Sequence, residues 1–172
     1  MGVFKGSSLI QFATFRELLE NENARKIIGF DMFGDFPQVD KVDSDKRFVA
    51  KWNERFRDEF LQKEDIERSL ESKGFGNMQL IKGDILQTVD KYLEENPHTR
   101  ISLLHMDVGV YEPAKYGLEK LFDRVVKGGV VILDDYSLME GETIAVEEFF
   151  SDKDYVIKRL PLSHAKPSYI IK

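Results

Sequence analysis

The sequence predicts an α/β fold built on a doubly wound, mainly parallel sheet. Short runs rich in β-branched residues alternate along the chain with longer stretches whose apolar residues recur at helical spacing. Helices between successive strands allow right-handed crossovers, which place the strands in parallel and the helices on both faces of the sheet. The 172 residues contain no linker, internal repeat or low-complexity segment. We therefore predict a single domain over residues 1–172.

The elements follow from the spacing of apolar residues and from turn signals. Helices are predicted at residues 7–20, 48–61, 64–73, 85–94, 113–126 and 143–150. Strands are predicted at residues 26–31, 78–82, 101–107, 130–134, 155–160 and 168–171. Residues 34–45 are predicted to form a loop, because they contain a proline and four aspartates. The pair Gly128-Gly129 is interpreted as the end of the helix at 113–126.

The last two strands are predicted to form an antiparallel hairpin. Only seven residues, 161–167, separate them. A parallel crossover needs a dozen residues or more, so the second strand must return beside the first.

Composition and charge exclude several classes of function. The chain has 25 basic and 31 acidic residues, a formal charge of −6, which argues against a partner with a phosphate backbone. No apolar run approaches the length of a membrane span, and no export signal is present. Cysteine is absent, which excludes disulfides, thiolate metal sites and a cysteine nucleophile. We expect a cytoplasmic protein with neither nucleic-acid nor membrane partners.

Aspartates close several of the predicted strands. The positions are Asp31, Asp84, Asp107, Asp134 and Asp135. In open α/β sheets ligands bind at the carboxyl ends of the strands, where clustered carboxylates repel one another unless a cation or hydroxyl donors relieve the repulsion. The alternative is that each aspartate caps the following helix or turn.

The chain starts with a glycine-containing turn that opens the first helix. Glycines such as Gly2 and Gly6 permit positive φ and a close backbone approach to a ligand. The segment has neither the Gly-Lys-Ser/Thr ending of a phosphate-binding loop nor the G-x-G-x-x-G pattern of dinucleotide-binding enzymes. The missing G-x-G-x-x-G disfavours a nucleotide-binding dehydrogenase.

Taken in order, these segments resemble a known enzyme family. Residues 2–8 (Gly-Val-Phe-Lys-Gly-Ser-Ser), 29–31 (Gly-Phe-Asp) and 83–84 (Gly-Asp) look like a class I S-adenosylmethionine-dependent methyltransferase. Three further segments are similar to the macrocin O-methyltransferase family, which methylates sugar hydroxyls on natural products and surface glycans. They are residues 103–113, with Leu-Leu-His-Met-Asp and Tyr-Glu-Pro at their ends, residues 128–136, Gly-Gly-Val-Val-Ile-Leu-Asp-Asp-Tyr, and residues 141–149, which begin Gly-Glu-Thr.

The resemblance implies a binding site for S-adenosylmethionine. The glycine turn, with Gly2, Gly6 and Ser7, corresponds to the segment that wraps the methionine end of the cofactor. Asp31 corresponds to the acid that holds both ribose hydroxyls. Asp84 and its neighbour Ile85 correspond to the residues beside the adenine.

The resemblance also implies a divalent metal site. Asp107, Asp134 and Asp135 correspond to the carboxylates that bind Mg²⁺ or another divalent cation. The metal would orient two vicinal sugar hydroxyls and lower the pKa of the one that attacks the methyl group. We therefore predict a transferase that acts on the sugar of a small-molecule or glycan acceptor, and a homo-oligomer is compatible with this prediction.

The identity of the general base is left open. Many family members have a second aspartate two residues after the first metal ligand, whereas this chain has Gly109. The alternatives are Asp107 itself, a hydroxide held by the metal, or His164 in the closing hairpin. For His164 a solvated loop position is the commoner interpretation, and His105 is interpreted as a core residue.

The second departure concerns the start of the chain. The family has a strand before the glycine turn, and here only Met1 precedes Gly2. We expect an N-terminally truncated domain with a gapped or rearranged sheet, or with a strand supplied by a neighbouring chain. This departure and Gly109 favour an alternative function, a non-catalytic binding protein with a methyltransferase fold.

Four aromatic residues, Phe48, Trp52, Phe56 and Phe60, recur at helical spacing. They are interpreted as helix core rather than as a platform for a substrate.

Overall fold

The structure, a computed structural model, describes residues 1–159 and 167–172. Its helices are α1 (Ser7–Leu19), α2 (Asp43–Phe56), α3 (Lys63–Ser72), α4 (Ile85–Glu95), α5 (Tyr111–Leu121), the short 3-10 helix η1 (Phe122–Arg124) and α6 (Glu140–Phe150). Its strands are β1 (Ile27–Asp31), β2 (Met78–Lys82), β3 (Ile101–Met106), β4 (Val125–Leu133), β5 (Lys158–Arg159) and β6 (Ser168–Ile171).

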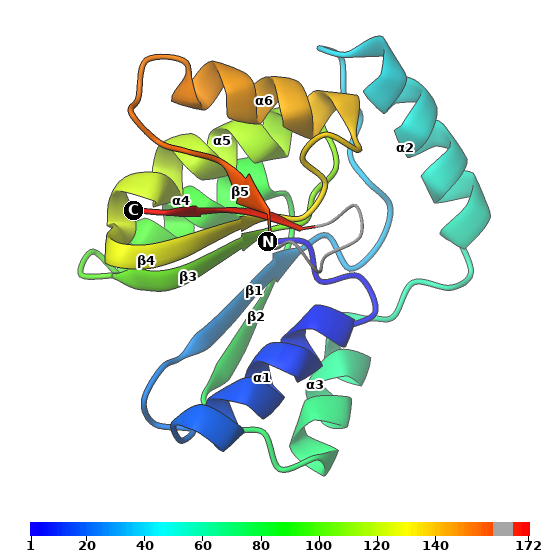
Figure 1. Ribbon diagram of the computed structural model, residues 1–172. Helices are drawn as coiled ribbons and strands as arrows, with labels where there is room; N and C mark the ends of the chain where they lie inside the picture. Colours follow the sequence, from blue (N-terminus) through cyan, green and yellow to red (C-terminus); the bar gives the residue numbers. More distant parts are fainter. Residues whose placement is uncertain (160–166) are drawn as a thin grey trace.

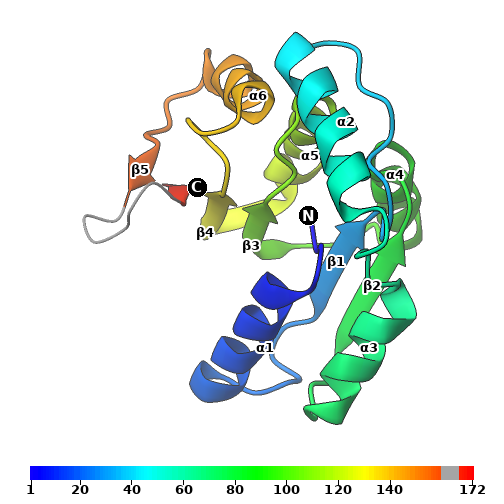
Figure 2. The ribbon, with the colours of Figure 1, turned by 90° about the vertical axis from the view of Figure 1, so that its right-hand side faces the viewer.

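The strands form two sheets that lie side by side (Figure 1). One sheet pairs β1 with β2 in parallel, and the other has the order β3-β4-β6-β5. Strand β3 is parallel to β4, whereas β6 runs antiparallel to both β4 and β5. Helices α1 and α3 lie on one side of the strands, and α4, α5 and α6 lie on the other (Figure 2). The mainly parallel sheet and the closing antiparallel hairpin are therefore confirmed.

A gap separates β1 from β3, and backbone hydrogen bonds of the first two residues bridge it. The ammonium group of Met1 donates a hydrogen bond to the carbonyl of His105 at 2.6 Å, and the Met1 carbonyl accepts one from Asp107 N–H at 3.1 Å. On the other side, Gly2 N–H donates to the carbonyl of Phe30 at 3.0 Å. Met1 and Gly2 thus pair with both sheets as the last residues of an intervening parallel strand would. The expected gapped sheet is confirmed.

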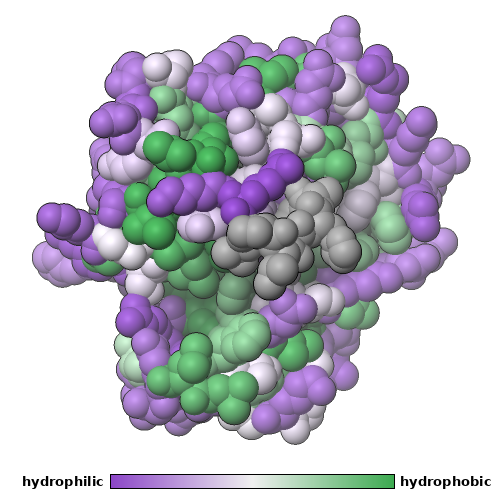
Figure 3. All heavy atoms as spheres, in the orientation of Figure 1, coloured by the Kyte–Doolittle hydropathy of each residue, from purple (hydrophilic) through white to green (hydrophobic). Residues whose placement is uncertain are grey.

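The gap opens into an apolar cavity of about 830 Å³. Side chains from α1, β1 and β3 line it, among them Phe12, Ile28 and Leu103. Leu19 is 80% exposed and Leu103 is 41% exposed on this side of the molecule. Figure 3 shows hydrophobic residues on both sides of the hollow. Apolar side chains at the open edges of two sheets are the expected consequence of an unfilled strand position.

Two main cores hold the layers together, beside a minor cluster of Val39, Val49 and Val110. The larger core packs α4, α5 and α6 against β3, β4 and β6 and also includes Phe30 of β1, with Met106, Leu118 and Leu133 fully buried. The smaller core joins α1 and α3 to β2 through Leu9, Ile66, Leu70 and Leu80. The two cores lie on opposite faces of the strands, as a doubly wound fold requires.

Helix α2 begins five residues earlier than predicted. Its first turn contains Asp45, an aspartate that the sequence analysis had assigned to the loop and that is buried in the structure. Asp45 is 1% exposed and accepts a hydrogen bond from Tyr111 N–H at 2.7 Å. A Cβ atom at Gly141 would overlap the Asp45 carboxylate, so this residue of α6 has to be glycine. The contact ties the start of α2 to the first turns of α5 and α6. Residues 43–45 therefore belong to the helix and not to the loop.

The helix predicted at 113–126 ends earlier, at Leu121, followed by η1. Val125 already pairs with Ile101, so the chain has entered β4 before it reaches Gly128 and Gly129. The pairing then shifts at Leu103, which lies opposite Val130. The two glycines form an irregularity within the strand, with φ +79° at Gly128, and do not terminate the helix. That interpretation was wrong.

The prediction that residue 160 ends a strand and that His164 lies in the hairpin loop concerns residues outside those described. Among the described residues, no helix is both long and apolar enough to cross a bilayer.

A strand added in front of Met1 should stabilise the protein. Six appended residues that alternate valine and threonine can pair with β1 and β3, satisfy their open edges and cover the apolar cavity. For a domain of this size, each kcal/mol gained raises Tm by about 2–4 °C, so calorimetry should show a clear increase. A flexible Gly-Ser extension of equal length is the control. Equal Tm values for the two extensions would contradict the strand position.

Candidate active site

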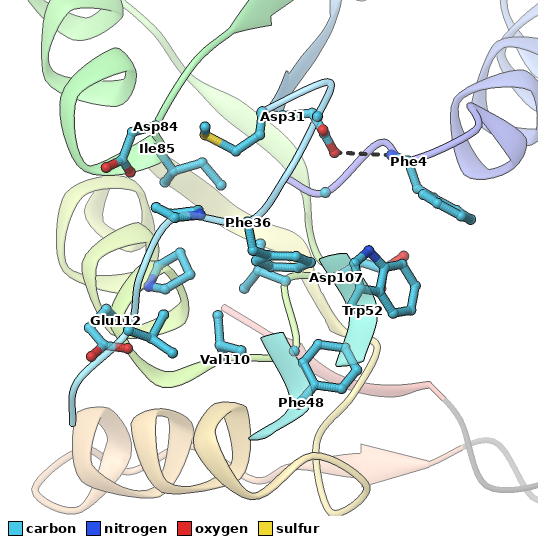
Figure 4. A pocket seen from close by; sticks show the side chains of 18 of the residues that line it. Phe4, Asp31, Phe36, Phe48, Trp52, Asp84, Ile85, Asp107, Val110 and Glu112 are labelled. Carbon is cyan, nitrogen blue, oxygen red and sulfur yellow. Dashed lines mark hydrogen bonds between the residues drawn. The ribbon is translucent and has the colours of Figure 1, made fainter. Parts of the chain in front are cut away.

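A second cavity, of about 430 Å³, lies at the carboxyl ends of β1, β2, β3 and β4. Of the residues that the sequence assigned to ligands, those that line it are Gly2, Asp31, Asp84, Ile85, Asp107 and Asp135. Figure 4 shows Asp84 and Ile85 at one side of this space and the rings of Phe48 and Trp52 at the opposite side. Gly6 and Ser7 do not line the cavity. Asp134 does not line it either, so the structure brings six of the nine assigned residues to a single space, with members of both the predicted cofactor site and the predicted metal site among them.

Asp31 holds the glycine turn against the end of β1. Its Oδ2 accepts hydrogen bonds from the N–H groups of Val3 at 2.6 Å and Phe4 at 3.0 Å, and its Oδ1 accepts one from Phe33 at 2.6 Å. Each carboxylate oxygen has two lone pairs, so one acceptor position remains, on Oδ1. We therefore expect Asp31 to bind one ribose hydroxyl rather than the two assigned from the sequence.

The glycine turn can reach the second sheet only because Gly2 has no side chain. Gly2 has φ +80°, and a Cβ atom there would overlap the carbonyl oxygen of Asp107. Gly6 also has positive φ, +84°, but it faces Ile66 of α3 and opens α1. Between them, Phe4 has φ +49° and places its ring beside the cavity. Gly2 is therefore the turn residue closest to the predicted ligand, and Gly6 shapes the helix start.

Asp84 is the N-cap of α4. Its side chain accepts a hydrogen bond from Leu86 N–H at 2.9 Å, so the alternative of a capping aspartate is confirmed at this position. The residue also lines the cavity together with Ile85, which is 9% exposed. A capping role and contact with a ligand are compatible, because the cap uses one oxygen of the carboxylate.

Three side chains meet where β3 and β4 end. Ligand atoms of His105, Asp107 and Asp134 all lie within 4.8 Å of one another. His105 Nε2 is 3.5 Å from Asp134 Oδ1, and its ring contacts the Phe12 ring edge-on. His105 therefore belongs to a polar cluster, and because its side chain is only 12% exposed and has Asp134 as a partner, it also agrees with the interpretation as a partnered core residue.

The pKa of Asp107 is raised to about 6. Burial is the largest cause, and the charge of Asp134 adds to it, while His105 acts in the opposite direction. Asp135 raises the pKa of Asp107 further and lines the cavity, whereas Asp134 is absent from the lining. Asp107 is thus the carboxylate that both faces the cavity and belongs to the cluster.

A buried glutamate that received no role from the sequence connects the two loops of the site. Glu142 of α6 is fully buried and accepts hydrogen bonds from Gly109 N–H and Asp135 N–H, both at 3.1 Å. Burial, with the charge of Asp135 next in size, raises its pKa to about 7. Glu142 fixes the backbone after β3 relative to the backbone after β4. The signal was its place in the Gly-Glu-Thr segment at the start of a helix.

Aromatic side chains form the opposite wall of the cavity. Phe36, Phe48, Trp52 and Phe60 line it together with Phe4. The rings of Phe48 and Trp52 are 5.3 Å apart, and Trp52 and Phe4 are 5.2 Å apart. Phe48 and Trp52 of α2 border the cavity, and so does Phe60, which lies beyond the end of this helix. The interpretation of these three residues as helix core was therefore wrong.

Comparison with known proteins identifies the family. The macrocin-O-methyltransferase (TylF) family matches residues 1–160. The chain belongs to this family. The predicted membership in an O-methyltransferase family is confirmed, and no match was found among curated proteins.

Several solved structures share the fold. The calicheamicin methyltransferase CalS11 is 27% identical with a TM-score of 0.73, and the match covers 99% of this chain and 69% of that chain. A structure of CalS11 without ligand, described as a TDP-rhamnose 3'-O-methyltransferase, is 29% identical with a TM-score of 0.69, covering 99% and 68%. The O-methyltransferase NovP has a TM-score of 0.83 at 21% identity, covering 100% and 69%, a likeness in fold.

Glu142 should make stability depend on pH. Its folded-state pKa, about 7, lies above the ordinary value of 4.5, so its contribution is present below about pH 4.5 and is lost as the pH rises through 7. Between pH 4.5 and 7 the free energy of unfolding of the wild type, measured with urea, should therefore fall by roughly 1–3 kcal/mol more than that of Glu142→Gln. Glu140→Gln, an exposed position in the same helical turn, should keep the wild-type slope. Parallel pH profiles for the wild type and Glu142→Gln would contradict the assignment.

Proposed function

We propose that this protein transfers a methyl group from S-adenosylmethionine to a sugar hydroxyl of a natural product or surface glycan. The observation that carries the proposal is the single cavity bordered by the glycine turn, Asp31 and Asp84 on the cofactor side and by Asp107 at the end of β3. Membership in the macrocin-O-methyltransferase family supports the reaction, and the similarity to CalS11 supports a sugar acceptor.

Methyl transfer requires a base for the hydroxyl proton. The acceptor oxygen attacks the methyl carbon, the carbon–sulfur bond breaks, and S-adenosylhomocysteine leaves with the sulfur's former bonding pair. Asp107 is the candidate base, because its carboxylate borders the cavity and, without a metal ion beside it, has a pKa raised to about 6. Gly109, where an added Cβ atom would meet the Asp135 carboxylate, offers no side chain for this step.

The residues at the ends of β3 and β4 fit a divalent cation. Carboxylates are hard oxygen ligands, and the mutual repulsion that raises the pKa of Asp107 is what a cation would relieve. We propose that Asp107 and Asp134, whose ligand atoms lie within 4.8 Å of each other and of His105, hold the ion. Asp135 lies outside this cluster but borders the same cavity as Asp107, and we propose it as the third carboxylate. When bound, Mg²⁺ would lower the pKa of a sugar hydroxyl.

A non-catalytic binding protein is the second candidate, and the gap between the sheets is the observation that favours it. At this gap Met1 and Gly2 take the place of a full strand beside β1 and β3, and they lead directly into the turn that should wrap the cofactor. The cluster at Asp107 favours catalysis, because a binding scaffold gains nothing from adjacent buried carboxylates.

Asp31→Ala should weaken cofactor binding. The change removes the ribose contact and the three hydrogen bonds that hold residues 3, 4 and 33. One charge-assisted hydrogen bond contributes about 1.5–3 kcal/mol, so calorimetry should show that the dissociation constant for S-adenosylhomocysteine rises by roughly tenfold or more. Asp35→Ala, an exposed acid four residues further along, is the control. An unchanged constant for Asp31→Ala would move the ribose site elsewhere.

The metal site is tested by Asp134→Ala. Mg²⁺ in millimolar amounts should raise the Tm of the wild type, because the ion binds the folded chain, and the variant should lose this increase. Asp123→Ala, in η1, should keep it. If Mg²⁺ raises the Tm of the wild type and of Asp134→Ala equally, the ion binds outside this cluster.

A further inference from the structure

His105 belongs to the polar cluster at the ends of β3 and β4, but the proposed function gives it no role. A ring nitrogen of His105 and carboxylate oxygens of Asp107 and Asp134 lie within 4.8 Å of one another. His105 and Asp107 are two positions apart at the end of one strand, a spacing that turns both side chains to the same face. Asp134 lies beside them, because its N–H donates to the carbonyl of Met106 at 2.9 Å. One nitrogen donor and two oxygen donors therefore meet at one place.

The contact between His105 and Asp134 is longer than an effective hydrogen bond. Nε2 and Oδ1 are 3.5 Å apart, whereas an N–H···O bond usually measures about 2.7–3.2 Å. Two donor atoms that share a first-row metal ion, each about 2.0–2.2 Å from it, lie roughly 3–3.6 Å from each other. The observed separation therefore suits two ligands of one ion better than a direct bond between the side chains.

The imidazole is held in this position by its surroundings. Its ring contacts the Phe12 ring of α1 edge-on, with the centroids 5.2 Å apart. Its backbone carbonyl accepts a hydrogen bond from the Met1 ammonium group at 2.6 Å. The side chain is only 12% exposed. A ligand whose orientation is already fixed by packing loses little freedom when an ion binds, which distinguishes His105 from a mobile surface histidine.

We propose that His105 is a nitrogen ligand of the cation, together with Asp107 and Asp134, and that the site selects a divalent first-row transition ion over Mg²⁺. This inference rests on the metal site of the proposed function and names the class of its ion. Imidazole is a common ligand of transition ions, whereas Mg²⁺ takes oxygen ligands. His105 borders the apolar cavity at the gap and Asp107 borders the cavity at the strand ends. An ion held by both side chains would lie at the boundary between the two cavities.

Mn²⁺ bound to the wild type tests the nitrogen ligand directly. Pulsed electron paramagnetic resonance should show a coupling to nitrogen, and this coupling should change when the protein carries ¹⁵N in its histidines alone. Such labelling separates an imidazole from the amine of Met1. The chain has three histidines. His105→Phe should lose the coupling, while His98→Asn, at an exposed position, and His164→Asn should keep it.

The choice of ion is measured by calorimetry with Co²⁺ and Mg²⁺. The wild type should bind Co²⁺ roughly a hundredfold more tightly than Mg²⁺. His105→Phe should weaken the binding of Co²⁺ by about tenfold or more and change that of Mg²⁺ by less than about threefold, because Mg²⁺ gains little from the imidazole. A merely structural role for His105 would weaken the binding of both ions together.

The failures of the two ideas are distinguishable. If none of the three ions binds the wild type, the metal site of the proposed function fails. If Mn²⁺ binds without a coupling to histidine nitrogen, or with a coupling that persists in His105→Phe, the inference about His105 is overturned. An equal loss of affinity for Co²⁺ and Mg²⁺ in His105→Phe also overturns it. The labelled wild type decides the question even if His105→Phe does not fold.

Discussion

The candidate site depends on the hydrogen bonds by which the main chain of Met1 and Gly2 joins the two sheets. These bonds reach β1 through Phe30 and β3 through His105 and Asp107. Asp31 and Asp84, which are predicted to contact the cofactor, follow strands of the first sheet, and Asp107 follows a strand of the second. This crossing, together with the core that Phe30 shares with α4 and β3, sets their relative position. A Cβ atom at Gly2 would push the crossing away from Asp107. The geometry of the site therefore rests on a contact between backbones.

Buried carboxylates serve two different purposes in this structure. Asp31, Asp45 and Glu142 accept hydrogen bonds from backbone N–H groups and join segments that are distant in sequence. Such bonds compensate for the loss of hydration and make the acids part of the framework. Asp107 is different, because its pKa is raised by burial and by its acidic neighbours, and it faces the cavity. The hydrogen bonds of Glu142 thus hold the backbone that follows Asp107, the proposed base, beside the backbone that follows β4.

Local patterns were sufficient to predict the strands and the acids that follow them. The strand at 78–82 was predicted with its observed bounds, and the short connection after β5 fixed the antiparallel hairpin. The roles of Asp45 and Glu142 were not predicted, because their hydrogen-bond partners, Tyr111 and Gly109, lie 66 and 33 residues away in the sequence. The contact of the aromatic rings with the cavity was not predicted either. The spacing of Phe48 and Trp52 indicates a helix face, but it does not indicate what that face borders. Periodicity shows that a face is apolar, and only the tertiary fold decides whether a core or a cavity covers it.

The central claim is that one cofactor site spans both sheets, and hydrogen exchange measured by mass spectrometry tests it most directly. Adding S-adenosylhomocysteine should slow hydrogen exchange in peptides from residues 1–6. It should also slow exchange in residues 29–34 and 83–88, which follow β1 and β2, and in residues 106–110, which follow β3 of the other sheet. Peptides from residues 12–24, in α1 and the loop after it, should exchange as before. Protection confined to one side of the gap, or absent at saturating ligand, would contradict a shared site.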